Sequence, residues 1–168
     1  NRLRDTGFFS ECGAYVLVDG QYGSTGKGLA AGMLAEMFHD EVGFVTTNAG
    51  PNSGHTSYWG DEKIVLCQLP TFGVVARCAG SYPTMLMNAG AIIDRDRLRM
   101  EIEEHEIEAF GLFVHPTAAV TSDAGSEYEK STIVHDIGST GKGTGAALAA
   151  KVMREPDAVI GGVDHDFT

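Results

Sequence analysis

The feature that most constrains this chain of 168 residues is the glycine-rich segment GQYGSTGKG at residues 20–28. It follows AYVLVD (14–19), an apolar run typical of a buried parallel strand. It precedes LAAGMLAEMF (29–38), whose apolar residues have helical spacing. In a strand–loop–helix unit of this kind, backbone N–H groups and the helix dipole face an anion. The segment therefore predicts a phosphate-binding loop with Lys27 as its cation.

The spacing within this segment departs from that of an ordinary nucleotide-binding P-loop. Five residues separate Gly20 from Gly26, and Gly28 stands where such a loop has its magnesium-binding hydroxyl. An ordinary P-loop NTPase is therefore disfavoured. The simpler alternative is a glycine turn that precedes a helix and carries a solvated lysine.

The hexapeptide GSTGKG occurs again at residues 138–143, before AALAAKVMR (146–154), a strong helix signal. No convincing apolar strand precedes this copy, so its residues alone favour a helix cap and turn. Thr140 could cap the helix or donate its hydroxyl to a phosphate. Arg154 could complement the C-terminal end of the helix dipole.

Strands and helices are expected to alternate along the rest of the chain. This pattern predicts an α/β fold, P-loop-NTPase-like, with a mainly parallel sheet and flanking helices, as one domain over residues 1–168. The expected strands are 41–47, 63–70, 112–115 and 157–163. A helix is expected within 94–111, a strand followed by a turn over 67–75, and a loop over 121–131.

The charge and the cysteines limit the classes of partner and the compartment. The formal net charge of −11 argues against nucleic acid as a partner, because such binding depends on neutralising phosphates. No apolar stretch is long enough to cross a membrane. The three cysteines form no CxxC pair, which predicts a cytoplasmic protein.

The loop NAGPNSGHT (48–56) places His55 just after the second expected strand. A lone histidine in a loop is more often an exposed residue than a catalytic one. The carboxyl ends of parallel strands, however, meet at one edge of the sheet, where ligands bind. We therefore expect His55 near the first glycine loop, where it could transfer a proton or stabilise charge.

These loops, taken in order, resemble those of adenylosuccinate synthetases. GQYGSTGKG, NSGHT, QLPTFG, MNAGAIID and IGSTGKGTGAALAAKVMR follow one another as the corresponding family motifs do, over roughly residues 14–155. The resemblance implies a ligase. A nucleoside triphosphate phosphorylates the 6-oxygen of a purine nucleoside monophosphate, and L-aspartate then displaces that phosphate.

The resemblance also implies roles for individual residues, with Mg²⁺ as the cofactor. His55, Ser24 and Lys27 would be catalytic. The residues implied to bind the donor triphosphate (ATP or GTP) are Gly23, Ser24, Thr25, Gly26, Lys27, Gly28, Gly54, His55 and Thr56. Those implied to bind the substrate nucleotide are Ser24, Asn52, Ser53, His55, Thr140 and Arg154, the last acting across a homodimer. The metal would be held by the Gly54 carbonyl and by Ser24.

Ser24 is the departure with the largest consequence, because the family has an aspartate there that acts as base and magnesium ligand. A serine hydroxyl is a poor base near neutral pH. The chain is therefore either inactive or similar to the phage 2-aminoadenylosuccinate synthetases, which have a small residue there and are thought to use dGMP. A small hydroxyl leaves room for the 2-amino group and can accept its hydrogen bond, so we favour dGMP over IMP.

The length of the chain differs from that of the family, whose members are considerably longer. We expect the chain to be the N-terminal part of a longer protein, without the aspartate loop and the donor-base pocket. A segment of this kind would bind phosphates and be inactive by itself.

Overall fold

The computed structural model describes residue 7 and residues 11–21, 23, 25–108, 111–132, 134 and 139–163. The helices in these ranges are α1 (Lys27–Phe38), α2 (Thr71–Cys78), α3 (Arg95–Glu104), α4 (Asp123–Thr132), α6 (Thr144–Met153) and α7 (Ile160–Val163). The strands are β1 (Phe44–Thr47), β2 (His55–Trp59), β3 (Glu62–Leu66), β4 (Thr84–Met87), β5 (Ile92–Ile93), β6 (Leu112–Val114) and β7 (Ala119–Val120). In these described ranges no helix is long and apolar enough to span a membrane.

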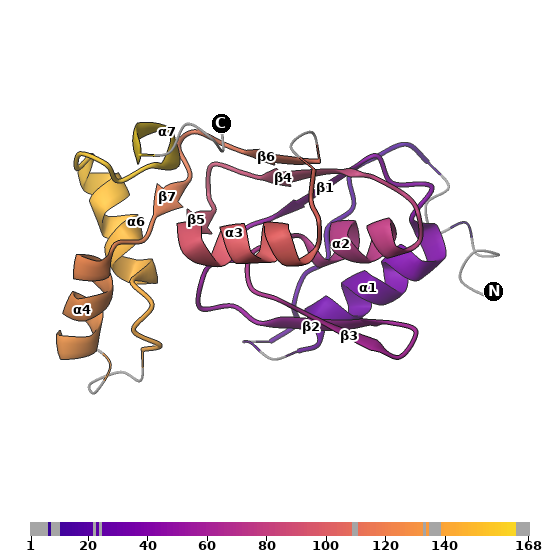
Figure 1. Cartoon of the computed structure of the whole chain (residues 1–168), viewed down its shortest axis with the longest axis horizontal. Coiled ribbons are helices and arrows are strands. Elements are labelled where there is room, and N and C mark those ends of the chain that lie inside the picture. Colours follow the sequence, from indigo (N-terminus) through magenta and orange to yellow (C-terminus); the bar gives the residue numbers. More distant parts are fainter. Residues whose placement is uncertain are drawn as a thin grey trace.

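A parallel sheet in the order β1–β4–β6 runs along the upper side of the molecule in Figure 1. Its side chains alternate, so that Met85 and Met87 are fully buried while Leu86 between them is exposed. Helices α1, α2 and α3 and the antiparallel β2–β3 hairpin lie on the buried side. A short parallel pair, β5–β7, leads to α4, α6 and α7 at the other end of the molecule. The predicted α/β class with a mainly parallel sheet is therefore confirmed.

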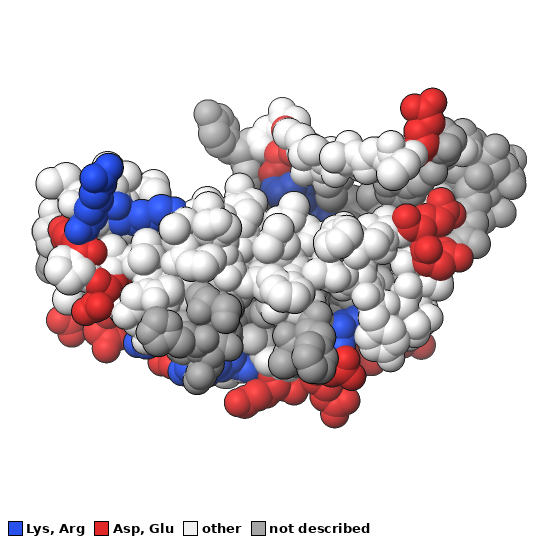
Figure 2. All heavy atoms as spheres, turned by 90° about the horizontal axis from the view of Figure 1, so that it is seen from above, with Lys and Arg blue, Asp and Glu red and all other residues white. Residues whose placement is uncertain are grey.

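The opposite face of the sheet carries exposed apolar side chains. Phe44 is 78% exposed and Phe113 is 54% exposed. Figure 2 looks at the molecule from that side, and there the charged side chains gather mainly toward the rim. A parallel sheet is usually covered on both faces, so this surface is unusual for the class.

Three predicted elements differ from the structure. Residues 14–19, predicted as a buried strand, form no strand, and Val16 is 81% exposed. The segment 71–78, predicted as strand end and turn, is helix α2, which begins directly after Pro70 and buries its valines in the core. The expected last strand within 157–163 contributes one bridge, between Val159 and Ala119, and then turns into α7.

Two further differences affect the site. The strand predicted over 63–70 is confirmed over Glu62–Leu66, but it pairs antiparallel with β2 instead of joining the parallel sheet. Residues 121–131, predicted as a loop, contain helix α4. This helix is polar, and its one buried residue is Glu129, whose contacts with α6 are described below.

Candidate active site

The first glycine loop and the NSGHT segment face each other across one cleft of about 520 Å³. The residues that line it are Gly23, Thr25, Gly26, Lys27, Gly28, Leu29, Asn52, Ser53, Gly54, His55, Thr56 and Tyr58. The set contains every residue predicted to bind the donor except Ser24, which lies outside the described residues, as does Tyr22. The expectation that His55 lies near the first loop agrees with this geometry, whereas the roles of these residues stay predictions.

Glycines in α1 allow this close approach. The buried residues of α1 are Gly28, Gly32, Ala35 and Phe38, which share one face and pack toward β2. A methyl group on Gly28 would lie 2.9 Å from both Cβ of His55 and the backbone nitrogen of Thr56. Glycine at position 28 therefore serves helix–strand packing, which accounts for the absence of a hydroxyl there.

The N-terminus of α1 opens into the cleft. Gly26 caps the helix in the left-handed conformation, with φ of 82°, and among the described residues no side chain caps the first turn. No acidic residue stands in that turn either. The free N–H groups and the positive end of the helix dipole are therefore available to an anion.

Asp19 binds two residues of this loop, a contact that the sequence did not predict. Its carboxylate accepts a hydrogen bond from the Thr25 hydroxyl and forms an ion pair with the Lys27 ammonium. Asp19 is the last residue of the segment 14–19, directly before the glycine loop. This position beside the loop is the signal by which the sequence could have pointed to Asp19. The hard oxygen donors of Asp19 and Thr25 are of the kind that Mg²⁺ prefers, so the residues present fit this ion.

His55 is partly buried at the start of β2, and its pKa lies below the ordinary value. Burial is the main cause, the positive charge of Lys27 lowers the pKa further, and Glu101 opposes the shift. The imidazole is therefore neutral near pH 7 when the cleft holds no anion.

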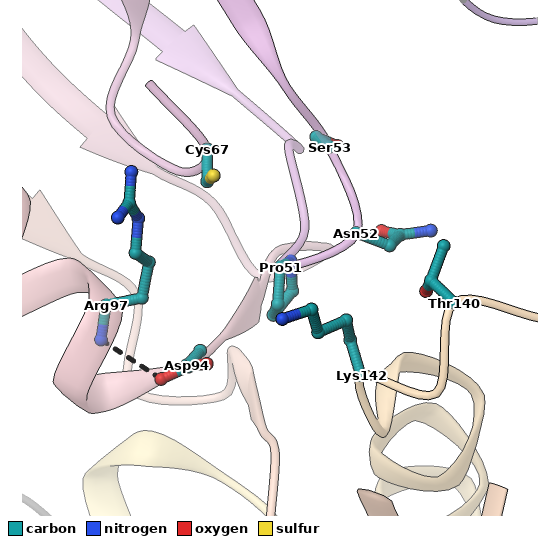
Figure 3. A pocket seen from close by; sticks show the side chains of 8 residues that line it. All are labelled: Pro51, Asn52, Ser53, Cys67, Asp94, Arg97, Thr140 and Lys142. Carbon is teal, nitrogen blue, oxygen red and sulfur yellow. Dashed lines mark hydrogen bonds between the residues drawn. The ribbon is translucent and has the colours of Figure 1, made fainter. Parts of the chain in front are cut away.

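A second cleft of about 370 Å³ lies beside the first and is lined by Pro51, Asn52, Ser53, Cys67, Asp94, Arg97, Thr140 and Lys142 (Figure 3). Asn52 and Ser53 line both clefts, so their loop is the wall between them. Figure 3 shows Asn52 and Thr140 side by side, with the Lys142 side chain reaching toward Pro51. The second glycine loop thus meets the NSGHT loop here, bringing together two of the predicted substrate-binding segments.

The second glycine loop differs from the first because an acidic side chain binds backbone N–H groups at the start of the helix that follows it. The carboxylate of Glu129, 2% exposed, accepts hydrogen bonds from the N–H groups of Gly143 at 2.8 Å and Ala146 at 3.0 Å. These two amides of α6 are therefore already occupied, so the loop presents side chains to the second cleft. One of these side chains is that of Lys142, which was not predicted as a site residue. The signal that could have indicated it is its position in the repeated hexapeptide, where it corresponds to Lys27.

A second buried carboxylate, Glu101 on α3, supports the opposite wall. It accepts hydrogen bonds from the N–H groups of Cys67 (2.7 Å), Gln68 (3.1 Å) and Leu69 (2.9 Å). It also accepts a hydrogen bond from Nε of Arg97, at 3.0 Å. Cys67 and Arg97 line the second cleft, so Glu101 fixes their backbone and side chain.

Arg154 does not line either cleft. It caps the C-terminal end of α6 in the left-handed conformation, with φ of 58°, and is exposed. The ten residues of α6 separate it from the second cleft by about 15 Å along the helix axis. Within one chain, therefore, Arg154 and Thr140 are not brought together.

Known proteins match this sequence over most of the chain. The N6-succino-2-amino-2'-deoxyadenylate synthase of Salmonella phage PMBT28 is 37% identical over 147 residues, which cover 86% of this chain and 38% of that protein. The adenylosuccinate synthetase of Bifidobacterium adolescentis is 31% identical over 83% of this chain and 32% of its own length.

Solved structures show the same likeness. The succinoaminodeoxyadenylate synthetase of cyanophage S-2L, bound to dGMP and to dATP as an energy donor, has a TM-score of 0.76 and 32% identity. The match covers 89% of this chain and 41% of that one. The fully ligated enzyme of Plasmodium falciparum, an adenylosuccinate synthetase, shares the fold with a TM-score of 0.69 and 23% identity, over 84% of this chain and 33% of that one.

Phage relatives at 33% to 37% identity confirm the resemblance to the phage-type branch. The chain spans about two fifths of the length of these relatives. The family model of adenylosuccinate synthetase matches residues 16–163. The chain therefore belongs to the adenylosuccinate synthetase family.

Proposed function

We propose that this chain is the phosphate-binding part of a purine-nucleotide ligase that joins L-aspartate to the 6-position of dGMP, with hydrolysis of a nucleoside triphosphate. The observation that carries the proposal is the pair of adjacent clefts with a common wall at Asn52 and Ser53. Two nucleotides that exchange a phosphoryl group need two anion-binding sites side by side.

The first cleft suits the donor, either ATP or GTP. The free N–H groups at the start of α1 would bind its phosphates, and Lys27 would leave Asp19 to pair with them. Mg²⁺, which the Gly54 carbonyl and Ser24 would hold, would neutralise charge that develops on the phosphates. The other residues of the cleft position the triphosphate against the second nucleotide.

The second cleft suits the substrate monophosphate. Thr140 and Lys142 would bind its phosphate through their side chains, because Glu129 occupies the N–H groups of Gly143 and Ala146. The 6-oxygen of the purine would attack the γ-phosphorus and release the diphosphate. The amino group of aspartate would then attack C6 and release inorganic phosphate.

His55 would act on the phosphoryl group while it passes from the donor to the substrate. Its neutral imidazole can donate one N–H to the phosphoryl group in transfer, and an arriving anion raises its pKa and stabilises the protonated form. Lys27 would therefore both bind phosphate and keep His55 neutral until phosphate arrives.

Ser24 favours dGMP as the substrate. A serine at that position leaves room for the 2-amino group and can accept its hydrogen bond, whereas an aspartate fills the same space. The phage relatives named for 2-amino products and the cyanophage structure with dGMP support this preference. The alternative is an ordinary adenylosuccinate synthetase acting on IMP with GTP, supported by the bacterial relatives.

Arg154 supports a homodimer. It is exposed and lies at the far end of α6 from Thr140, so it would reach the substrate phosphate of a partner subunit. The compartment we propose is the cytoplasm.

Phosphate release with dGMP or IMP, a triphosphate, Mg²⁺ and aspartate tests the proposal on the intact protein. Turnover that depends on aspartate and on dGMP supports it, and turnover with IMP alone supports the ordinary synthetase. Tight nucleotide binding without turnover would support a third reading, a catalytically inactive nucleotide-binding module.

A further inference from the structure

Asp19, directly before the first glycine loop, places a carboxylate against that loop, although position 24 has none. Asp19 contacts both Thr25 and Lys27, two residues that line the cleft. Among the described residues that line this cleft, none is acidic. In the described part of the chain, Asp19 is the acidic residue whose carboxylate binds this loop.

The ion pair between Asp19 and Lys27 is poorly explained as a stabilising contact. The Lys27 side chain is 35% exposed and that of Asp19 is 20% exposed. Ion pairs at this degree of exposure contribute little to stability, because water competes for both groups. An aspartate also lowers the affinity of the loop for a phosphate unless a cation compensates it.

The two partners of Asp19 indicate what that cation is. In phosphate-binding loops, a lysine reaches the β- and γ-phosphates, and a hydroxyl and a nearby aspartate serve the magnesium ion bound to them. Asp19 contacts the lysine and a hydroxyl of the loop at once. Mg²⁺ on a triphosphate commonly takes one or two carboxylates from the protein.

We propose that Asp19 is a ligand of the Mg²⁺–triphosphate complex and supplies the carboxylate that the loop lacks at position 24. When the triphosphate enters, Lys27 leaves Asp19 for the phosphates, and the carboxylate is free to bind Mg²⁺ directly or through a water molecule. This inference rests on the proposed function. It adds a metal ligand outside the motif that the family resemblance assigns.

Calorimetric titration of the intact protein with the β,γ-imido analogues of ATP and GTP tests the inference. Each titration is done in Mg²⁺ and in EDTA, and the ratio of the two Kd values is the magnesium enhancement. Asp19→Asn is expected to lower this enhancement by about 10- to 100-fold, the usual effect of losing a carboxylate that serves a metal. In EDTA, the variant should bind at least as tightly as the unaltered protein, because Lys27 is released and a negative charge is gone.

Asp61→Asn is the matched control, since Asp61 lies in the exposed turn between β2 and β3 and loses the same charge. It should leave both Kd values unchanged. Asp19→Ser also lacks the carboxylate and carries the test if Asp19→Asn fails to fold. A Mn²⁺ titration followed by electron paramagnetic resonance, with the analogue present, should show weaker Mn²⁺ binding in either Asp19 variant.

An unchanged magnesium enhancement in the Asp19 variants would overturn the inference. If the variants bound the analogue equally more weakly in Mg²⁺ and in EDTA, Asp19 would only hold the loop in place, and the inference would again be wrong. Either result leaves the proposed function intact. Failure of the unaltered protein to bind either analogue would overturn the proposed function and this inference with it.

Discussion

The carboxylate of Glu129 lies 2.8 Å from the backbone nitrogen of Gly143, so a side chain of α4 occupies the N-terminus of α6. The two copies of GSTGKG therefore present different groups to a ligand. In the part of the chain that the structure describes, no side chain caps the helix of the first copy, whereas the second has the N–H groups of Gly143 and Ala146 bound by Glu129.

Glu129→Ala is expected to destabilise the protein, because it leaves two N–H groups without their acceptor in a buried place. Each such group costs about 1–3 kcal/mol. Urea unfolding measures the loss, with Glu127→Ala as the control because Glu127 is exposed on the same helix. Equal effects of the two substitutions would show that the α4–α6 contact contributes no stability.

Gly28→Ala should weaken triphosphate binding and lower the free energy of unfolding by about 1–3 kcal/mol. The added methyl group would lie 2.9 Å from Cβ of His55 and from the backbone of Thr56, so α1 would have to move away from β2. Gly43→Ala, where an added Cβ meets nothing within 4 Å, is the control. Normal binding by Gly28→Ala would contradict the close approach.

The pKa of His55 should be below 6.5, and an NMR titration of the imidazole resonances measures it, with His55→Gln for assignment. Lys27→Gln should raise this pKa, because it removes a positive charge that lowers it. Since the pKa is lower in the folded state, the neutral form contributes stability that is present above pH 6.5 and is lost as the pH falls through the folded value. A pKa at or above 6.5 in the unaltered protein would refute the prediction.

Ser24→Asp should reduce turnover with dGMP more than turnover with IMP, because the carboxylate takes the space of the 2-amino group. The ratio of kcat/KM for the two substrates measures the change. Ser139→Asp, in the second copy of the hexapeptide, is the control for an added charge. Unchanged kinetics with dGMP would contradict the steric argument.

The sequence predicted the α/β class and the approach of the first glycine loop to the histidine loop, but it did not predict every element of the fold. Glycine loops and a histidine loop depend on local chemistry, so the meeting of Lys27 and His55 in one cleft could be expected. Asp19 was not expected there. Its contacts with Thr25 and Lys27 depend on the path of the backbone between residues 19 and 25, which local sequence patterns do not predict.

Elements that depend on tertiary contacts were missed for the same reason. The sequence of helix α4 is so polar that it predicted a loop. In the structure, the Glu129 side chain of α4 accepts a hydrogen bond from the N–H group of Gly143 at the start of α6. Helix α2 carries β-branched residues that favour a strand, yet Val74 and Val75 are buried in the core as parts of a helix. Burial outweighed local propensity in this helix.

The most direct test of the account is aspartate-dependent phosphate release by the intact protein, measured in parallel with dGMP and with IMP. The account predicts release with dGMP, a triphosphate and Mg²⁺, and much slower release with IMP. Release with IMP but not with dGMP would contradict the proposed substrate, and no release with either nucleotide would contradict the proposed ligase.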